Sequence, residues 1–321
     1  MQINPDAALF PPRLSVIQAL TEALVDEILI AFGQDRAMRS RFLRKIAQIP
    51  AGRFTQLIDQ FDQRVCREGL PAASRWVTAR FIRSVRVRGR QNLPAQGPLL
   101  VASNHPGALD SVSMLGAFPR DDTRIYVTGS PFFKTIPSSR EHCVFVEDPT
   151  NVDERRRAIR LGIEHLQSGG SLLIFPTGRV DPEPACTPGS METMQEWSPS
   201  LEILLRKAPQ TKLVLGAMSD VLLHRYIAHP LTRLQPPGWK RQRASEYLQV
   251  IQLLLSRKIL ELGTLVSFGA PHTVESFDGG AASRRWMDEI IRRAQALFAE
   301  HMAARTQGFE GAVELLKIKG L

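Results

Sequence analysis

The segment 101–111, VASNHPGALDS, holds the residues best suited to chemistry in this sequence. Asp110 follows His105 by five positions. A carboxylate that binds one imidazole nitrogen leaves the other nitrogen available as a general base. The preceding apolar run predicts a buried strand, and residues 106–107, Pro-Gly, predict a turn that brings Asp110 back to the imidazole. We therefore predict a catalytic His105–Asp110 pair. Taken alone, this spacing is equally typical of a surface capping contact.

A second segment of this kind follows the apolar run SLLI and consists of Phe175, Pro176, Thr177, Gly178 and Arg179. The proline ends the strand, the glycine lets the backbone approach a ligand, and the guanidinium can bind phosphate or carboxylate through two hydrogen bonds. By itself the segment also fits an ordinary turn that ends in a surface arginine. Both segments come at strand ends, which is where open α/β sheets place their ligands.

From about residue 85 onward, predicted strands alternate with predicted helices, and these elements position the two segments. Alternation in VRVRGRQNLP predicts a strand from about Val85, and short apolar runs predict strands at 99–102, 124–128, 143–146, 171–176, 212–218 and 264–268. Amphipathic stretches between them predict helices, and Thr150 with Asp153 forms a capping-box pair before one of these. We predict an α/β fold, with a mixed, mostly parallel sheet flanked by helices.

Residues 15–84 show helical periodicity throughout. Apolar residues recur every three or four positions, and we expect helices to end at Gly33, Pro50 and Gly69. Pro71 suits the first turn of a fourth helix. The sequence therefore predicts two domains, a small N-terminal helical bundle at 1–84 and an α/β domain at 85–321.

Composition narrows the class of protein. The 321 residues carry a formal net charge of +9, which favours anionic partners. Zinc-finger spacing, RNP-like aromatics and dense basic runs are missing, so we expect no nucleic-acid partner. The three cysteines lie far apart without CxxC spacing, which predicts no metal site and a reducing, cytoplasmic location. We also expect no secretory signal and no transmembrane helix.

Together the two segments resemble the glycerolipid acyltransferase family, the glycerol-phosphate and lysophosphatidate acyltransferases. Asn104, His105 and Asp110 match its NHxxxxD motif, LLIFPTGR resembles its FPEGTR motif, and VRGRQNLPAQGPLLVAS resembles the lead-in to the first motif. The resemblance covers about residues 85–220. It implies that His105 is the general base, that Asp110 orients it, and that the substrate is bound by the following residues: Asn104, Gly107, Phe175, Pro176, Thr177, Gly178 and Arg179.

The sequence departs from the family in the motifs that hold the acceptor and its phosphate. The third motif is one residue short and has Thr177 in place of glutamate. The second ends in Glu147 and Asp148 without an arginine, and the fourth has Gly216 and Ala217 where a proline is usual. These changes affect the expected acceptor and leave the His–Asp pair intact.

The resemblance implies an O-acyltransferase that takes a fatty acyl group from acyl-CoA or acyl carrier protein, with no cofactor. The implied acceptor is glycerol 3-phosphate or a lysophospholipid. Two alternatives remain open, a divergent member that acylates another lipid or an amine, and a non-catalytic lipid-binding protein. A thiol nucleophile at Cys143, beside His142, is disfavoured because adjacent strand residues face opposite sides.

The N-terminal helices also permit two interpretations. An apolar patch with a basic rim would dock the protein peripherally on an anionic membrane surface. The same helices would equally cover one side of the sheet or form a dimer contact.

Overall fold

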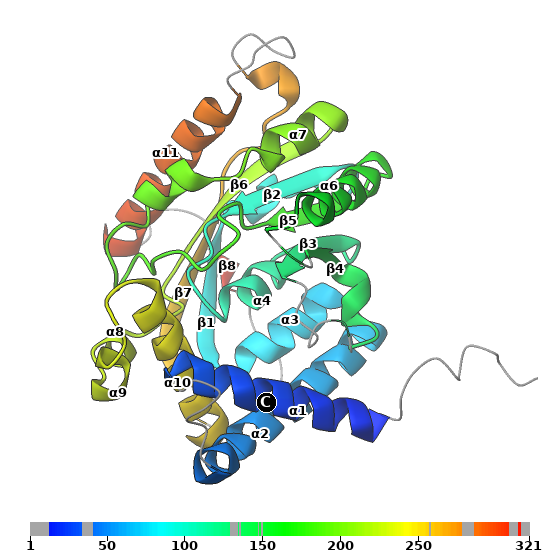
Figure 1. Cartoon of the computed structure of the whole chain (residues 1–321). Coiled ribbons are helices and arrows are strands. Elements are labelled where there is room, and N and C mark those ends of the chain that lie inside the picture. The colour runs from blue at the N-terminus through cyan, green and yellow to red at the C-terminus, as the bar shows by residue number, and fades with distance from the viewer. Residues whose placement is uncertain are drawn as a thin grey trace, which may run out of the picture.

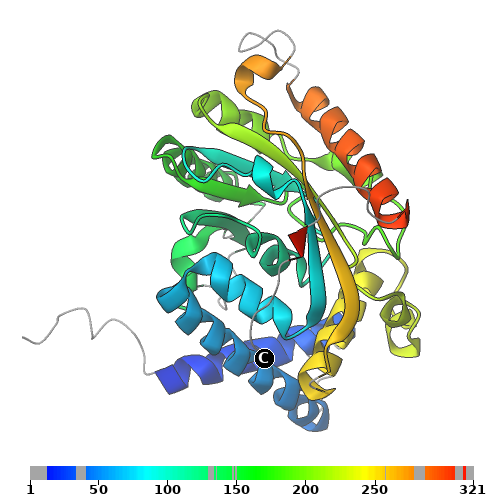
Figure 2. The same ribbon diagram turned by 180° about the vertical axis from the view of Figure 1, so that it is seen from behind.

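The computed structural model describes residues 13–33, 41–128, 134, 136–146, 148, 150–256, 258–277, 286–307 and 314–315. Figures 1 and 2 show one twisted sheet with helices on both faces. The strands are β1 (Ile82–Arg88), β2 (Leu99–Ser103), β3 (Thr123–Thr128), β4 (Cys143–Val146), β5 (Ser171–Ile174), β6 (Lys212–Ser219), β7 (Leu260–Phe268) and β8 (Glu314–Leu315). The helices are α1 (Arg13–Ala31), α2 (Arg41–Glu68), α3 (Leu70–Ala79), α4 (Asp110–Leu115), α6 (Val152–Gln167), α7 (Ser200–Lys207), α8 (His224–Ile227), α9 (Pro230–Arg233), α10 (Trp239–Ser256) and α11 (Trp286–Gln307).

The sheet is mixed and mostly parallel, as the sequence predicts. Its strand order is β4-β3-β5-β2-β6-β7-β1-β8. The pairs β6–β7 and β1–β8 are antiparallel, and the other five adjacent pairs are parallel. The fold class is thus confirmed, and β2, the strand that leads to His105, lies at the centre of the sheet between β5 and β6.

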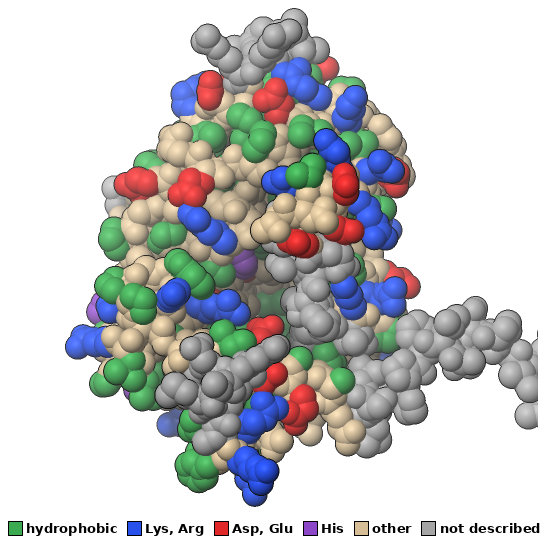
Figure 3. All heavy atoms as spheres, viewed as in Figure 1, with side chains coloured by type: hydrophobic (Ala, Val, Ile, Leu, Met, Phe, Trp, Pro, Cys, Tyr) green, Lys and Arg blue, Asp and Glu red, His purple; other side chains and the backbone are tan. Residues whose placement is uncertain are grey.

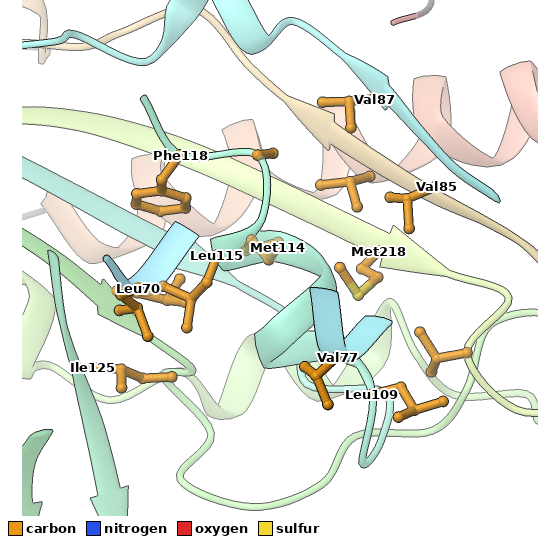
Figure 4. Close-up of a cluster of buried hydrophobic side chains, with 14 of the residues drawn as sticks. Leu70, Val77, Val85, Val87, Leu109, Met114, Leu115, Phe118, Ile125 and Met218 are labelled. Carbon is orange, nitrogen blue, oxygen red and sulfur yellow. The ribbon is translucent and has the colours of Figure 1, made fainter. Parts of the chain in front are cut away.

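Side-chain alternation along β2 divides the core into two layers. Leu99 and Val101 point to one face, where α2, α3 and α4 pack. Leu100 and Ala102 point to the opposite face, which α6, α7 and α11 cover. Figure 4 shows the first layer, in which Met114 of α4 lies among side chains from α3, β1 and β6. This packing anchors α4 directly beneath the turn that carries the candidate base.

The N-terminal helices differ from the prediction at Pro50. The helix does not end there, because α2 continues through Pro50 to Glu68. Proline removes one helical hydrogen bond at a penalty of about 3 kcal/mol. Pro50 is buried, and its neighbours Ala47 and Ala51 pack against α1, so apolar burial in this part of α2 offsets the penalty. The described part of the region therefore contains three helices, and the four expected were one too many.

Other N-terminal predictions hold. Gly33 follows the end of α1 with a positive φ of 78°, and Pro71 lies in the first turn of α3. The proposed boundary at residue 84 falls inside β1, and α2 and α3 share a core with the sheet. The division at 84/85 stays a prediction.

The start of α6 is displaced by one residue from the predicted cap. Asn151 is the N-cap, and its side chain accepts hydrogen bonds from the amides of Asp153 and Glu154. Thr150 donates its hydroxyl to Asp148 instead, at 2.6 Å. Asn and Thr are both good capping residues, so their adjacency left the sequence pattern ambiguous.

Candidate active site

Two adjacent strands deliver the two predicted segments to the same edge of the sheet. β2 and β5 are parallel, and Ala102 pairs with Ile174. The residues that follow both strands therefore emerge side by side. The imidazole of His105 stacks on the ring of Phe175, with centroids 4.4 Å apart and planes 11° from parallel. The tertiary structure thus joins segments that are about seventy residues apart.

His105 and Asp110 form a closely bonded pair. His105 Nδ1 lies 2.5 Å from Asp110 Oδ2, and the amide of Gly107 donates to the same oxygen at 3.0 Å. The amide and the hydroxyl of Ser111 bind the other oxygen. Asp110 is fully buried, whereas the His105 side chain is 25% exposed. The turn at 106–107 therefore brings the carboxylate to the imidazole as predicted, and Nε2 has no hydrogen-bond partner among the described residues.

Opposing effects act on the pKa of His105. Burial lowers the pKa of the imidazole, but the charge and hydrogen bond of Asp110, together with the charges of Glu246 and Asp181, outweigh burial. The net pKa of His105 is raised above its ordinary value. Asp181 lies close because its Oδ2 accepts the backbone amide of His105 at 2.8 Å. The sequence analysis missed Asp181, although it stands only two residues after Arg179.

A buried glutamine on α10 ties the two segments together. Gln242 Nε2 donates to the carbonyl of Pro106 at 3.0 Å and to that of Asp181 at 2.7 Å. Its Oε1 accepts the amide of Glu183 at 3.0 Å. One side chain thus holds the turn of the first segment against the loop of the second. Nothing in the sequence pattern of α10 marks this glutamine.

Two further carboxyl groups lie in this region and were also missed. Glu183 is fully buried and accepts the amides of Ala185, Asp220 and Val221 at 2.8 to 3.2 Å. Burial raises its pKa to about 7. Glu246 of α10 is 7% exposed, and burial raises its pKa to about 8. The neighbourhood of His105 is therefore rich in carboxyl groups.

Asn104, which the family resemblance assigns to substrate binding, forms hydrogen bonds with a neighbouring strand. It is fully buried, its Nδ2 donates to the carbonyl of Met218 at 2.9 Å, and its Oδ1 accepts the amide of Met218 at 2.8 Å. Both ends of the amide are occupied, so Asn104 fastens the end of β2 to β6. These two bonds give Asn104 a role in joining the strands, and its contact with substrate stays a prediction.

The FPTGR segment forms a tight turn beside the histidine. Gly178 donates its amide to the carbonyl of Phe175 at 3.0 Å and has a φ of 68°, which glycine adopts without strain. The Thr177 hydroxyl donates to the carbonyl of Arg179 at 2.9 Å, and Pro176 accepts the amide of Ser198 at 3.0 Å. Among the described residues of this turn, Phe175 is the one whose side chain contacts His105.

The guanidinium of Arg179 is already paired. It forms an ion pair with Glu196, and the two side chains are 57% and 54% exposed. An exposed pair of this kind contributes at most about 1 kcal/mol, so an anionic ligand can displace it. Arg179 is thus an accessible anion contact only after it releases Glu196.

The remaining motif positions lie further out or serve packing. Glu147 lies outside the described residues, and Asp148 is exposed with its carboxylate bound to Thr150. At Gly216 a Cβ would stand 3.1 Å from the side chain of Ser103, so glycine allows β6 to approach β2 closely. The departures in the fourth motif therefore have a packing explanation here.

The thiol alternative finds no support in the geometry. Burial raises the pKa of Cys143 to about 12, and its Sγ lies 3.4 Å from the carbonyl of Ser139. A thiol with so high a pKa is a poor nucleophile at neutral pH. His142 belongs to a short 3-10 helix before β4, not to the strand as expected. Among the described residues, no group of three or more His, Cys, Asp or Glu side chains could hold a metal ion.

Figure 3 shows a hollow in one face of the molecule, with a histidine side chain on its floor. Both basic and acidic side chains surround its mouth. An imidazole that is held by a carboxylate and open to solvent on its other side can accept a proton from a bound hydroxyl or amine.

Comparison with known proteins finds a family match for the central part of the sequence. Residues 84–208 match the acyltransferase family. The crystal structure of the 1-acyl-sn-glycerophosphate (LPA) acyltransferase PlsC from Thermotoga maritima is similar to this one, with a TM-score of 0.46 and 15% sequence identity, over 92% of this chain and 96% of that one. No curated protein matches the sequence.

Proposed function

Because residues 84–208 match the acyltransferase family, we propose that this protein transfers a fatty acyl group from a thioester to a lipid acceptor. The donor is acyl-CoA or acyl carrier protein, and the acceptor hydroxyl belongs to a glycerolipid such as glycerol 3-phosphate or lysophosphatidate. The observation that carries the proposal is the His105 imidazole, which is bound through Nδ1 to the buried Asp110, is 25% exposed, and has no partner for Nε2 among the described residues.

The proposed reaction is a direct transfer. His105 Nε2 removes the proton of the acceptor hydroxyl while its oxygen forms a bond to the thioester carbonyl carbon. The carbon–sulfur bond then breaks, and the imidazolium returns the proton to the thiolate. Asp110 fixes the tautomer and stabilises the imidazolium, since a carboxylate is its hydrogen-bond partner.

A backbone amide supports the developing oxyanion in this proposal. In the turn before α4, the amides of His105, Gly107 and Asp110 are already engaged. Ala108 is exposed, and its amide donates to no acceptor in the described part of the chain, which makes it the turn's candidate donor. Such a donor stabilises the transition state most strongly where water is excluded.

A second acceptor class is favoured by the carboxyl groups around the histidine. Asp110, Asp181 and Glu246 all act on His105 as acidic neighbours, and Arg179 is paired with Glu196. Carboxylates repel a phosphate dianion and attract a cation. An acceptor that presents an uncharged hydroxyl or an amine, with any phosphate held further out, suits this environment. A purely lipid-binding role is disfavoured, because binding alone does not require an open imidazole held by a buried carboxylate.

We also propose that the protein works at an anionic membrane surface. No helix in the described part of the chain is long and apolar enough to span a bilayer. One stripe of α2 instead exposes Phe42, Ile46 and Ile49, by 70%, 52% and 57%. Arg41 and Lys45 stand exposed beside it. Apolar side chains flanked by cations are the pattern of a helix that lies in the interface.

The direct test is release of free thiol. Purified protein is incubated with palmitoyl-CoA or palmitoyl-acyl carrier protein and, separately, glycerol 3-phosphate, lysophosphatidate, lysophosphatidylcholine or a lipid amine. We expect acceptor-dependent release with at least one of these, lowered about a hundredfold or more in His105→Ala, since a general base contributes that much. Folded protein that is silent with every acceptor, or a fully active His105→Ala, would overturn the proposal.

A further inference from the structure

Glu246 is a buried acid that the proposed reaction does not use. It lies on α10, beyond the segment that matches the acyltransferase family. Its carboxyl packs against the turn that carries His105, because a Cβ built on Gly107 would stand 3.2 Å from both Cδ and Oε1 of Glu246. The absence of a side chain at Gly107 therefore leaves the space that this carboxyl occupies.

The environment of this carboxyl is unusual for a structural residue. Glu246 is 7% exposed, and its buried Oε1 has no hydrogen-bond partner in the described structure. Buried polar atoms in proteins are normally satisfied, so each exception requires an explanation. A methionine or leucine would fill this position without the desolvation penalty. What a glutamate adds to simple packing is an ionisable charge and a hydrogen-bonding group beside Gln242.

That charge is close enough to act on the imidazole. Glu246 raises the pKa of His105, and His105 in turn lowers that of Glu246, although burial keeps the latter at about 8. Gly107 links the two physically, since its amide binds the same Asp110 oxygen that binds His105. The other charged or titratable groups that face Glu246 are Asp110 and Glu183.

We propose that Glu246 is a positioning residue of this site, whose carboxyl, packed against the turn at Gly107, sets the proton affinity of His105 through its charge. The two groups then titrate as a coupled pair, in which Glu246, with a pKa of about 8, ionises as the pH rises through that value. Ionised Glu246 favours the imidazolium, and protonated Glu246 favours the neutral imidazole that serves as the base. The catalytic consequence rests on the proposed acyl transfer, whereas the electrostatic coupling does not.

The coupling is measured directly by NMR titration of the histidine rings in the full-length protein, with His105 assigned from the spectrum of His105→Asn. Removal of the charge in Glu246→Gln should lower the pKa of His105 by about half a unit or more. The control Glu164→Gln removes a charge from the exposed surface of α6 and should leave that pKa unchanged. Glu246→Asp keeps the charge and should restore the raised pKa at least in part.

A second readout connects the coupling to activity. In Glu246→Gln the acid limb of the pH profile of kcat/KM should move to lower pH by the same amount, because the base loses its proton more easily. Glu246→Met, which fills the space without charge, answers the same question if the Gln variant does not fold. An unchanged His105 pKa in a folded, uncharged variant would overturn the inference. A shifted pKa without any transfer activity would instead overturn the proposed function and leave the coupling established.

Discussion

At the scale of single residues, the site depends on how Asp110 is held. Its two oxygens accept from His105, from the amide of Gly107 and from Ser111, so the carboxylate is fixed before any substrate arrives. A fixed carboxylate keeps the proton on Nδ1 and leaves Nε2 as the proton acceptor that the proposed reaction requires. The short sequence separation of the pair made this arrangement predictable, because a single turn closes the distance.

Asp110→Asn should lower kcat by about a thousandfold or more, because an amide neither stabilises the imidazolium nor enforces the tautomer. The pKa of His105 should fall at the same time, since Asp110 raises it. Steady-state kinetics and the NMR titration measure the two effects. Asp153→Asn, an exposed change at the start of α6, is the matched control and should retain wild-type kinetics. Retention of more than about a tenth of the activity in Asp110→Asn would contradict the assigned role.

Other residues of the site were beyond prediction for a physical reason. Asp181, Gln242 and Glu246 approach His105 only through the fold, and their sequence surroundings are ordinary for a loop and a polar helix face. For Asn104 the structure adds a role that the motif did not suggest. The family motif suggested a substrate contact, and the structure uses its amide to join β2 to β6.

At the scale of elements, α10 connects the turn after β2 with the loop after β5 through its side chains. Gln242 and Glu246 are one helical turn apart and reach the same turn of the chain from one face of the helix. A second glutamine on this face, Gln249, makes an equivalent bridge at the other end of the helix, between the carbonyl of Val221 and the amide of Leu223.

These two glutamines allow a matched comparison. Gln242→Leu should lower kcat by about tenfold to a hundredfold, because small misplacements of a catalytic group have effects of that size. Gln249→Leu should destabilise the protein to a similar degree, since both residues are buried and leave two or more backbone groups unsatisfied, yet it should keep its kcat. Thermal unfolding and kinetics separate the two effects. Equal losses of kcat in both variants would contradict a specific role of Gln242 in positioning the site.

At the scale of the whole molecule, the net charge of +9 and the exposed apolar stripe of α2 both favour an anionic lipid surface as the partner. The helices at the N-terminal end gather on one side of the sheet, away from α7 and α11 (Figure 1). An apolar stripe with basic neighbours on that end would orient the molecule on a lipid surface.

Phe42→Asp/Ile46→Asp should therefore reduce binding to vesicles of phosphatidylglycerol and phosphatidylcholine by about tenfold, through lost apolar burial and added repulsion. Co-sedimentation at low salt measures the binding. Leu161→Asp/Ile203→Asp makes the same change at exposed positions of α6 and α7, and should bind as the wild type does. Equal binding by both double variants would contradict docking through α2, and no binding by wild-type protein would rule out the membrane proposal.

The sequence by itself determined the features that depend on neighbours along the chain. Alternation and apolar runs identified the strands, and a Pro-Gly turn brought Asp110 to His105. Only the tertiary structure decided the rest. Whether α2 continues through Pro50 depended on burial against α1, and the strand-joining role of Asn104 depended on β6. The close approach of α10, with Gln242 and Glu246, depended on contacts more than a hundred residues apart, which local propensity does not encode.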